Sequence, residues 1–84
     1  MNEMTYEEAL QAIPKGKYRH FKGNEYEIVC IARDCESTQP LVVYKALYGD
    51  GMIWVRPAKY WYEQITRNGQ TYTRFTRIDN EGKT

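Results

Sequence analysis

Residues 40–57, PLVVYKALYGDGMIWVRP, form the stretch that decides the fold of this chain. Two apolar runs, 41–48 and 52–56, flank the sequence Gly49-Asp50-Gly51. β-Branched and aromatic residues fill both runs and suit the pleated surface of a sheet. Glycine readily adopts the positive φ angles of a tight reversal. We therefore predict a β-hairpin, bounded at each end by a proline that cannot donate a hydrogen bond to a ladder.

A short amphipathic helix is predicted upstream of this hairpin, over about residues 5–13. Thr5 and Glu8 have the spacing of a capping box, in which each side chain accepts a hydrogen bond from the other residue's backbone amide. Apolar residues then recur at helical spacing until Pro14 and Gly16 end the pattern. A helix of this length is unstable alone, so we expect it to plug one open end of the domain.

Two strands are predicted between the helix and the hairpin, over residues 17–22 and 25–33, with Gly23-Asn24 as the turn. In the longer strand, alternation places two sets of side chains on opposite faces: Tyr26, Ile28, Cys30 and Ala32 on one, and Glu27, Val29, Ile31 and Arg33 on the other. Branched apolar residues on both faces predict a strand that bends to serve two packing layers.

The chain after residue 57 is predicted to form one helical turn and a second hairpin. Pro57 suits the first position of a helical turn, which would lay Tyr60 or Trp61 over the mouth of the domain. Asn-Gly between two alternating runs is a strong hairpin signal. Here Asn68-Gly69 separates the runs 62–67 and 70–78.

These elements add up to five or six short antiparallel strands, one leading helix and one helical turn. Short strands at intervals of about 8–12 residues are typical of a small barrel or sandwich, and barrel closure removes exposed sheet edges. We predict a mainly-β fold, a small antiparallel SH3-like barrel, with an OB-like barrel as the alternative. The expected organisation is a single domain over residues 1–84: the helix at about 5–13, the barrel at about 16–78 and a flexible tail at 79–84.

The composition is that of a folded domain: 84 residues, 42% of them hydrophobic and 27% charged. The net charge of +1 exerts no strong general attraction on nucleic acid or membranes, although basic residues cluster at 15–22, 56–59 and 67–77. Cys30 and Cys35 would lie roughly 16 Å apart in one extended strand, too far for a disulfide. We expect a cytoplasmic protein with reduced thiols, no metal, no cofactor and no membrane partner.

Catalysis is not expected from this sequence. His20 is the only side chain that ordinarily titrates near physiological pH. Its spacing from Cys30, Ser37 and Asp50 does not assemble a nucleophile, a base and an orienting acid. The Gly49–Gly51 turn lacks the Lys-Ser/Thr pair and the helix start of a phosphate loop. A small enzyme that uses His20 is the least favoured alternative.

The remaining candidates are cationic and aromatic, and they come from the first strand and the central hairpin. Arginine forks suit carboxylate or phosphate, and flat rings stack on bases. The predicted ligand-binding residues are Tyr18, Arg19, His20, Tyr44, Tyr48, Trp54 and Arg56. They favour a non-catalytic binding module for an anionic, ring-bearing ligand such as a nucleotide or single-stranded nucleic acid. A peptide-binding or homodimerisation module is the alternative.

A family resemblance is carried by four segments: GKYRHFKG at 16–23, Tyr26-Glu27, residues 40–51, and WVRP at 54–57. Together they resemble a widespread family of small bacterial proteins known as a domain of unknown function, found mostly as free-standing chains of this size. The resemblance covers about residues 14–75. It implies a compact bacterial or phage domain with no assigned activity, and it lends no catalytic residue.

Overall fold

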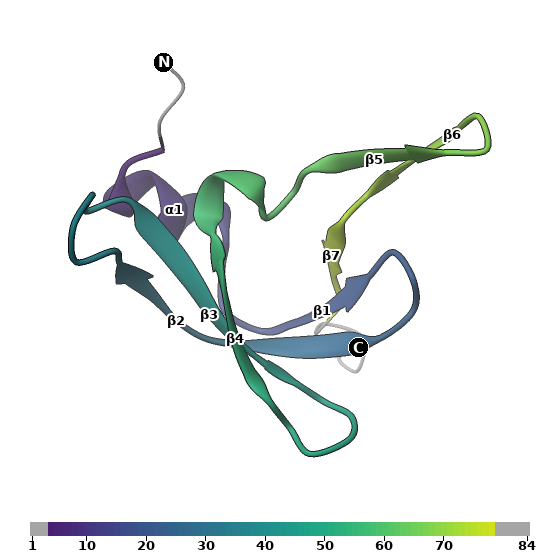
Figure 1. Cartoon of the computed structure of the whole chain (residues 1–84), viewed down its shortest axis with the longest axis horizontal. Helices are drawn as coiled ribbons and strands as arrows, with labels where there is room; N and C mark the ends of the chain where they lie inside the picture. Colours follow the sequence, from purple (N-terminus) through teal and green to yellow (C-terminus); the bar gives the residue numbers. More distant parts are fainter. Residues whose placement is uncertain (1–3, 79–84) are drawn as a thin grey trace.

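Seven strands and two helical segments follow one another along the described part of the chain, residues 4–78, in this computed structural model (Figure 1). They are α1 (Tyr6–Ala12), β1 (Lys17–His20), β2 (Glu25–Arg33), β3 (Pro40–Ala46), β4 (Ile53–Pro57), the 3₁₀ turn η1 (Ala58–Tyr60), β5 (Gln64–Arg67), β6 (Gln70–Thr73) and β7 (Phe75–Arg77). The tail predicted at 79–84 lies outside the described residues.

The strands form two antiparallel sheets, which confirms the mainly-β class. The main sheet has the order β4-β3-β2-β1-β7, and β5 pairs with β6 in a separate hairpin. Figure 1 shows this hairpin extending away from the main sheet. Within residues 4–78, β4 and β7 are the two edges of the main sheet and do not pair with each other. The sheet is therefore not closed into a complete barrel, and the SH3-like topology stays a prediction.

The last predicted strand is divided into β6 and β7 at Arg74. The Arg74 amide donates to the Glu63 carbonyl at 2.8 Å, and the Arg74 carbonyl accepts from the Phe21 amide at 2.9 Å. The chain thus leaves the β5–β6 hairpin here and joins β1, where Phe75 pairs with His20. This division raises the number of strands from the predicted five or six to seven.

The predicted capping box begins α1. The Thr5 amide donates to Glu8 Oε1 at 2.8 Å, and the Glu8 amide donates to Thr5 Oγ1 at 3.0 Å. Ala9 and Ile13 are buried in the hydrophobic core, and α1 packs against β2. This packing supplies the stability that a seven-residue helix lacks by itself.

A β-bulge in β2 changes the faces predicted for its residues. Ile28 pairs with Tyr44, whereas Cys30 pairs with Val43, so the register shifts between the two pairs. Beyond the bulge Ile31 is buried and Cys30 is exposed, so Ile31 shares the buried face of Ile28, where Cys30 was predicted. One extra residue moves every later side chain of the strand to the other face. The bend was expected, but its effect on the pleat depends on where the extra residue falls.

The central hairpin is confirmed: β3 ends two residues before the end of the predicted run 41–48, and β4 lies one residue later than the predicted run 52–56. β3 and β4 pair antiparallel over five residue pairs, and the Ala46 amide donates to the Met52 carbonyl at 2.9 Å beyond them. In the turn, Gly49 and Gly51 have φ angles of 58° and 69°. Glycine adopts this left-handed region more readily than any other residue.

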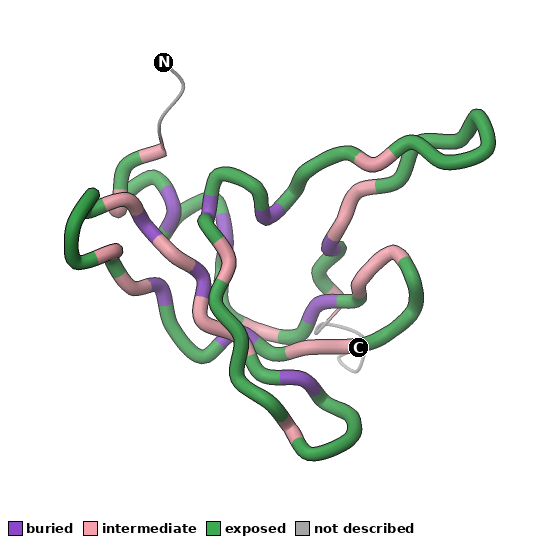
Figure 2. The backbone as a smooth tube through the Cα atoms, viewed as in Figure 1, coloured by how far each residue is buried: buried purple, intermediate pink, exposed green. Residues whose placement is uncertain are grey.

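The second hairpin forms at the predicted Asn68-Gly69 turn. Asn68 and Gly69 have φ angles of 53° and 80°, as a type I′ turn requires of both central residues. Figure 2 shows that the β5–β6 hairpin is mostly exposed, whereas the buried residues are spread over the main sheet, α1 and the turn after β4.

Trp61 is placed in the core by η1, the helical turn predicted after Pro57. Trp61 is fully buried, whereas its neighbour Tyr60 remains 46% exposed. Two rings meet Trp61 in T-shaped contacts, Tyr18 at 5.4 Å and Tyr44 at 5.0 Å between centroids. The face of the main sheet that Trp61 covers is called the core face below.

Candidate functional site

Four rings from β1, β2, β3 and the β3–β4 turn lie together at the rim of the core face. Three of them, His20, Tyr26 and Tyr44, contact the buried ring of Phe75 at centroid distances of 5.1, 5.7 and 5.6 Å. The fourth, Tyr48, packs on Tyr26 at 5.5 Å. All four rings are only partly buried or exposed. The arrangement therefore offers ring surface to solvent above a closed aromatic core.

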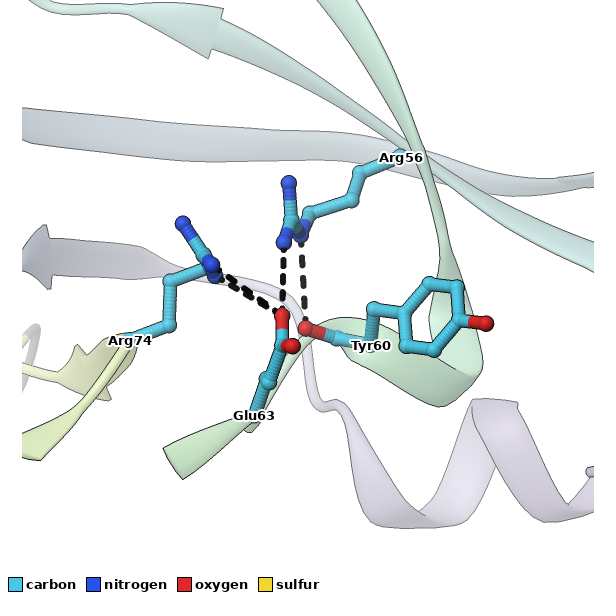
Figure 3. Close-up of polar contacts among 4 residues, drawn as sticks. All are labelled: Arg56, Tyr60, Glu63 and Arg74. Atoms are coloured by element: carbon cyan, nitrogen blue, oxygen red, sulfur yellow. Dashed lines mark hydrogen bonds and ion pairs between the residues drawn. The ribbon is translucent and has the colours of Figure 1, made fainter. Parts of the chain in front are cut away.

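Two arginines converge on one carboxylate oxygen of Glu63 (Figure 3). Arg56 Nη2 and Arg74 Nη2 each lie 3.1 Å from Glu63 Oε1. Arg56 Nε also donates to the Tyr60 carbonyl at 3.3 Å, which holds its guanidinium in place. Because two positive charges share one negative charge, the group carries a net charge of +1. Arg56 and Arg74 are called the arginine pair below.

The positive charges of the arginine pair affect the pKa of His20. The pKa of His20 lies below its ordinary value of 6.5 because of burial, and then because of three positive neighbours: Arg74, Lys22 and Arg56. His20 Nδ1 accepts a hydrogen bond from the Lys22 amide at 3.1 Å. A nitrogen that accepts carries no proton, so the neutral imidazole has its proton on Nε2. His20 is thus a neutral hydrogen-bond donor at physiological pH and a weakened base.

The hydroxyls of Tyr26 and Tyr44 stay protonated over the same pH range. Burial, followed by the hydrogen bond with Tyr48, raises the pKa of Tyr26 to about 12. The two hydroxyl oxygens lie 2.8 Å apart. Burial also raises the pKa of Tyr44, and outweighs the opposing charges of the arginine pair. A neutral phenol beside arginines is a hydrogen-bond donor for an anion.

Five of the seven predicted site residues lie on the core face. His20, Tyr44 and Tyr48 belong to the ring group described above. Arg56 pairs in register with the buried Val42, and Trp54 with Tyr44, so both side chains point to this face. Trp54 remains 46% exposed there.

The other two predicted residues lie elsewhere. Tyr18 is fully buried and its hydroxyl donates to the Pro14 carbonyl at 2.7 Å, so its ring belongs to the core. Arg19 lies on the opposite face of β1, where Arg19 Nη2 is 3.0 Å from Glu25 Oε2. Alternation along a strand separates Arg19 from its neighbours Tyr18 and His20, so these three consecutive residues cannot all face one ligand.

Three further residues complete the site and were not among the predicted set: Tyr26, Glu63 and Arg74. A basic stretch at 67–77 was visible in the sequence, but it contains three arginines. Only the break between β6 and β7 brings Arg74 to the core face. Glu63 carries no sequence signal, because its role depends on two partners that are 7 and 11 residues away.

Several other features of the described residues bear on function. Among residues 4–78 no cluster of three side chains suited to a metal ion is present. Cys30 and Cys35 are free and exposed thiols. The helical segments between residues 4 and 78 are all too short and too polar to cross a membrane.

Fold and site together define a small mainly-β domain with a cationic, aromatic face. The chain belongs to the family described as protein of unknown function (DUF1653), whose sequence profile matches residues 16–77. This confirms the resemblance to a domain-of-unknown-function family. A crystal structure of a DUF1653 protein from Bordetella bronchiseptica is similar, with 29% sequence identity and a TM-score of 0.75 over 83% of this chain and 92% of that one. Among curated proteins, none is significantly similar to this chain.

Proposed function

We propose that this domain is a non-catalytic binding module for an anionic ligand that carries a flat ring. The observation that carries the proposal is the convergence of the arginine pair on the single carboxylate of Glu63. The pair lies beside the partly exposed rings of His20 and Tyr44, whose pKa values both respond to its charge. Guanidinium groups suit carboxylate or phosphate, and the rings offer stacking surface to the rest of the ligand.

A binding role fits the chemistry of His20 better than a catalytic role. A general base works best with a pKa near the operating pH, whereas burial and three positive neighbours lower the pKa of His20. Its Nδ1 is also occupied by the Lys22 amide. These contacts favour a fixed, neutral imidazole that donates from Nε2 to a bound anion.

The experiment is a screen of nucleoside phosphates by thermal shift, followed by titration of any ligand found at several salt concentrations. We expect binding that weakens as salt rises, because the main attraction is electrostatic. Arg56→Gln and Arg74→Gln should each weaken binding by about tenfold or more, the usual effect of one lost charge-assisted contact. Arg19→Gln is the matched control, because it removes the same charge from the opposite face of β1.

Two outcomes would count against the proposal. One is that no anionic ligand raises the melting temperature, since a ligand at 100 times its Kd stabilises by about 2.7 kcal/mol. In a domain this small, that stabilisation is a shift of roughly 10–20 °C. The other is an Arg19→Gln variant that binds as weakly as Arg56→Gln, which would mean that general charge and not this site is responsible.

A second candidate function is homodimerisation through β4, and one observation favours it. β4 is an edge of the main sheet, and the last residue before it and its first three residues are apolar and about half exposed: Met52, Ile53, Trp54 and Val55. An exposed apolar edge segment of this kind readily pairs with another strand. Sedimentation equilibrium of the protein and of a Val55→Lys variant tests this candidate, because a charge at the edge should abolish a β4-mediated dimer.

We also propose a cytoplasmic location, where thiols such as those of Cys30 and Cys35 stay reduced.

A further inference from the structure

The ring surface of the core face continues beyond the arginine pair to the β5–β6 hairpin. Tyr44 contacts Tyr26 at 5.4 Å between centroids, and Tyr26 contacts His20 at 6.4 Å. His20 in turn packs on Phe21 at 4.6 Å. Phe21 stacks on Tyr72 of β6, with centroids 5.8 Å apart and planes 25° apart. Rings from β3, β2, β1 and β6 thus form one continuous series, which we call the ring series.

The far end of the ring series borders a cationic hollow. The hollow has a volume of about 260 Å³ and is lined by Phe21, Lys22, Arg67, Asn68 and Tyr72. The Arg67 guanidinium lies 5.5 Å from the centroid of the Phe21 ring, and Lys22 Nζ lies 5.9 Å from it. None of the lining residues is acidic.

The two cations of the hollow are available to a ligand. Neither Lys22 nor Arg67 takes part in an ion pair with another described residue. The arginine pair, by contrast, shares Glu63. The hollow therefore attracts an anion with two charges that the described chain leaves uncompensated, next to an exposed ring, since Tyr72 is 39% exposed.

We propose that the ligand of this domain is a single-stranded nucleic acid that runs along the ring series from the arginine pair to the cationic hollow. Phosphate groups would contact the cations at both ends, and unpaired bases would stack on the rings between them. Repetition is what favours a polymer: the surface offers positive charge and an exposed ring at two separate places, joined by further rings. A single nucleotide fills only one of them. This inference rests on the proposed function, because one end of the series is the arginine pair.

Stacking of this kind needs bases whose faces are free, so it selects single strands over duplexes. Ring stacking tolerates any base, and phosphate contacts carry no sequence information. We therefore expect little sequence preference. The net charge of only +1 for the whole chain means that attraction comes from these local cations.

The test compares a mononucleotide with oligothymidylate and oligouridylate of about eight nucleotides, a length within the site sizes of small single-strand binding domains. Affinity is measured by fluorescence anisotropy, with the mononucleotide as competitor, at several salt concentrations. We expect both oligomers to bind more tightly than the mononucleotide. The variants Lys22→Gln and Arg67→Gln should weaken oligomer binding and lower the slope of log K against log salt by about 0.7 for each lost phosphate contact. Arg67→Gln should not change mononucleotide binding at the arginine pair, because Arg67 is not among the charges that act on His20.

Tyr72 tests the stacking contribution. Tyr72→Ala should weaken oligomer binding by roughly fivefold to 150-fold, the measured range for loss of one stacked base. Tyr72→Phe keeps the ring and should bind as the unchanged protein does. Normal binding by Tyr72→Phe would also show that a change at this position does not by itself unfold the hairpin. Lys17→Gln is the matched charge control, because Lys17 lies on the face of β1 opposite to Tyr18 and His20.

The outcomes separate this inference from the proposed function. If the mononucleotide binds through Arg56 and the oligomers bind no more tightly, the inference is overturned and the proposed function stands. Oligomer binding that needs Arg67 but not Arg56 or Arg74 would overturn the proposed site and the path between the two places. If neither ligand binds, both are wrong. Preference for a duplex over the single strand would also overturn the inference, since paired bases cannot stack on the ring series.

Discussion

Trp61 and Phe75 stack face to face, with ring centroids 3.9 Å apart and planes 3° apart. Trp61 follows η1, whereas Phe75 begins β7 at one edge of the main sheet. Both rings are buried, with exposed fractions of 0% and 2%. The pair therefore anchors the turn after β4 to the opposite edge strand, in a sheet that hydrogen bonds do not close. Packing of these two side chains thus connects the two edges of the sheet, which strand pairing would connect in a closed barrel.

Trp61→Ala should lower the free energy of unfolding by about 3–5 kcal/mol, the usual cost of truncating a buried aromatic ring. A domain of this size has a total stability of roughly 4–12 kcal/mol, so this variant loses a large share of its stability. Trp61→Phe should lose less, about 1–3 kcal/mol, because a ring remains. The indole Nε1 of Trp61 has no hydrogen-bond partner among the described residues, so the change to Phe removes no hydrogen bond between them. Urea unfolding followed by circular dichroism measures all three proteins.

The control for the stacking prediction is Tyr60→Ala, one residue away. Tyr60 is 46% exposed, so its truncation should cost less than about 1 kcal/mol. Equal losses for Tyr60→Ala and Trp61→Ala would contradict a core built around Trp61.

Glu63→Gln should strengthen anion binding at the arginine pair by about threefold to tenfold. The carboxylate oxygen that competes with the ligand for Arg56 and Arg74 loses its charge, while the amide oxygen can still accept their hydrogen bonds. Each exposed ion pair contributes only about 0.2–1 kcal/mol, so the free energy of unfolding should change by less than about 1–2 kcal/mol. Titration with inorganic phosphate, followed by NMR of the arginine Nε–H signals, measures the affinity.

Glu25→Gln is the matched control for this charge removal, because Glu25 pairs with Arg19 at 3.0 Å on the other face of β1. Its phosphate affinity should remain that of the unchanged protein. Weaker phosphate binding in Glu63→Gln would show that the carboxylate mainly positions the arginines, and would contradict the competition described here.

The free energy of unfolding should decrease as the pH falls below about 6.5, because His20 becomes protonated. Its pKa is lowered in the folded state, by burial first and by neighbouring positive charge second. The unfolded chain therefore binds a proton at a higher pH than the folded protein does. Protonation of His20 as the pH falls thus favours the unfolded chain. The stability that neutral His20 provides is complete above pH 6.5 and is lost as the pH falls to the folded-state pKa.

The measurement for His20 is the difference in unfolding free energy between pH 7.5 and pH 5.5, in the unchanged protein and in His20→Asn. The asparagine oxygen can replace Nδ1 as the acceptor for the Lys22 amide. His20→Asn should lose less stability on acidification than the unchanged protein. Identical losses in the two proteins would mean that His20 titrates with an ordinary pKa.

The sequence by itself determined the elements whose cause is local. Gly49, Gly51 and Asn68-Gly69 adopt positive φ angles at the turns predicted for them, because few other residues tolerate that backbone region. Thr5 and Glu8 form their predicted capping box, since both partners lie within one helical turn. The mainly-β class follows from these turns and from the β-branched and aromatic runs between them. Each of these outcomes depends on residues only a few positions apart.

Only the tertiary structure decided which side chains share a surface. The bulge in β2 exchanges the faces of Cys30 and Ile31. The break at Arg74 depends on hydrogen bonds to Glu63 and Phe21, which are 11 and 53 residues away. Strand period places alternate residues, but a single extra residue reverses that placement. The arginine pair is therefore a product of register and long-range pairing, which no local pattern of the sequence encodes.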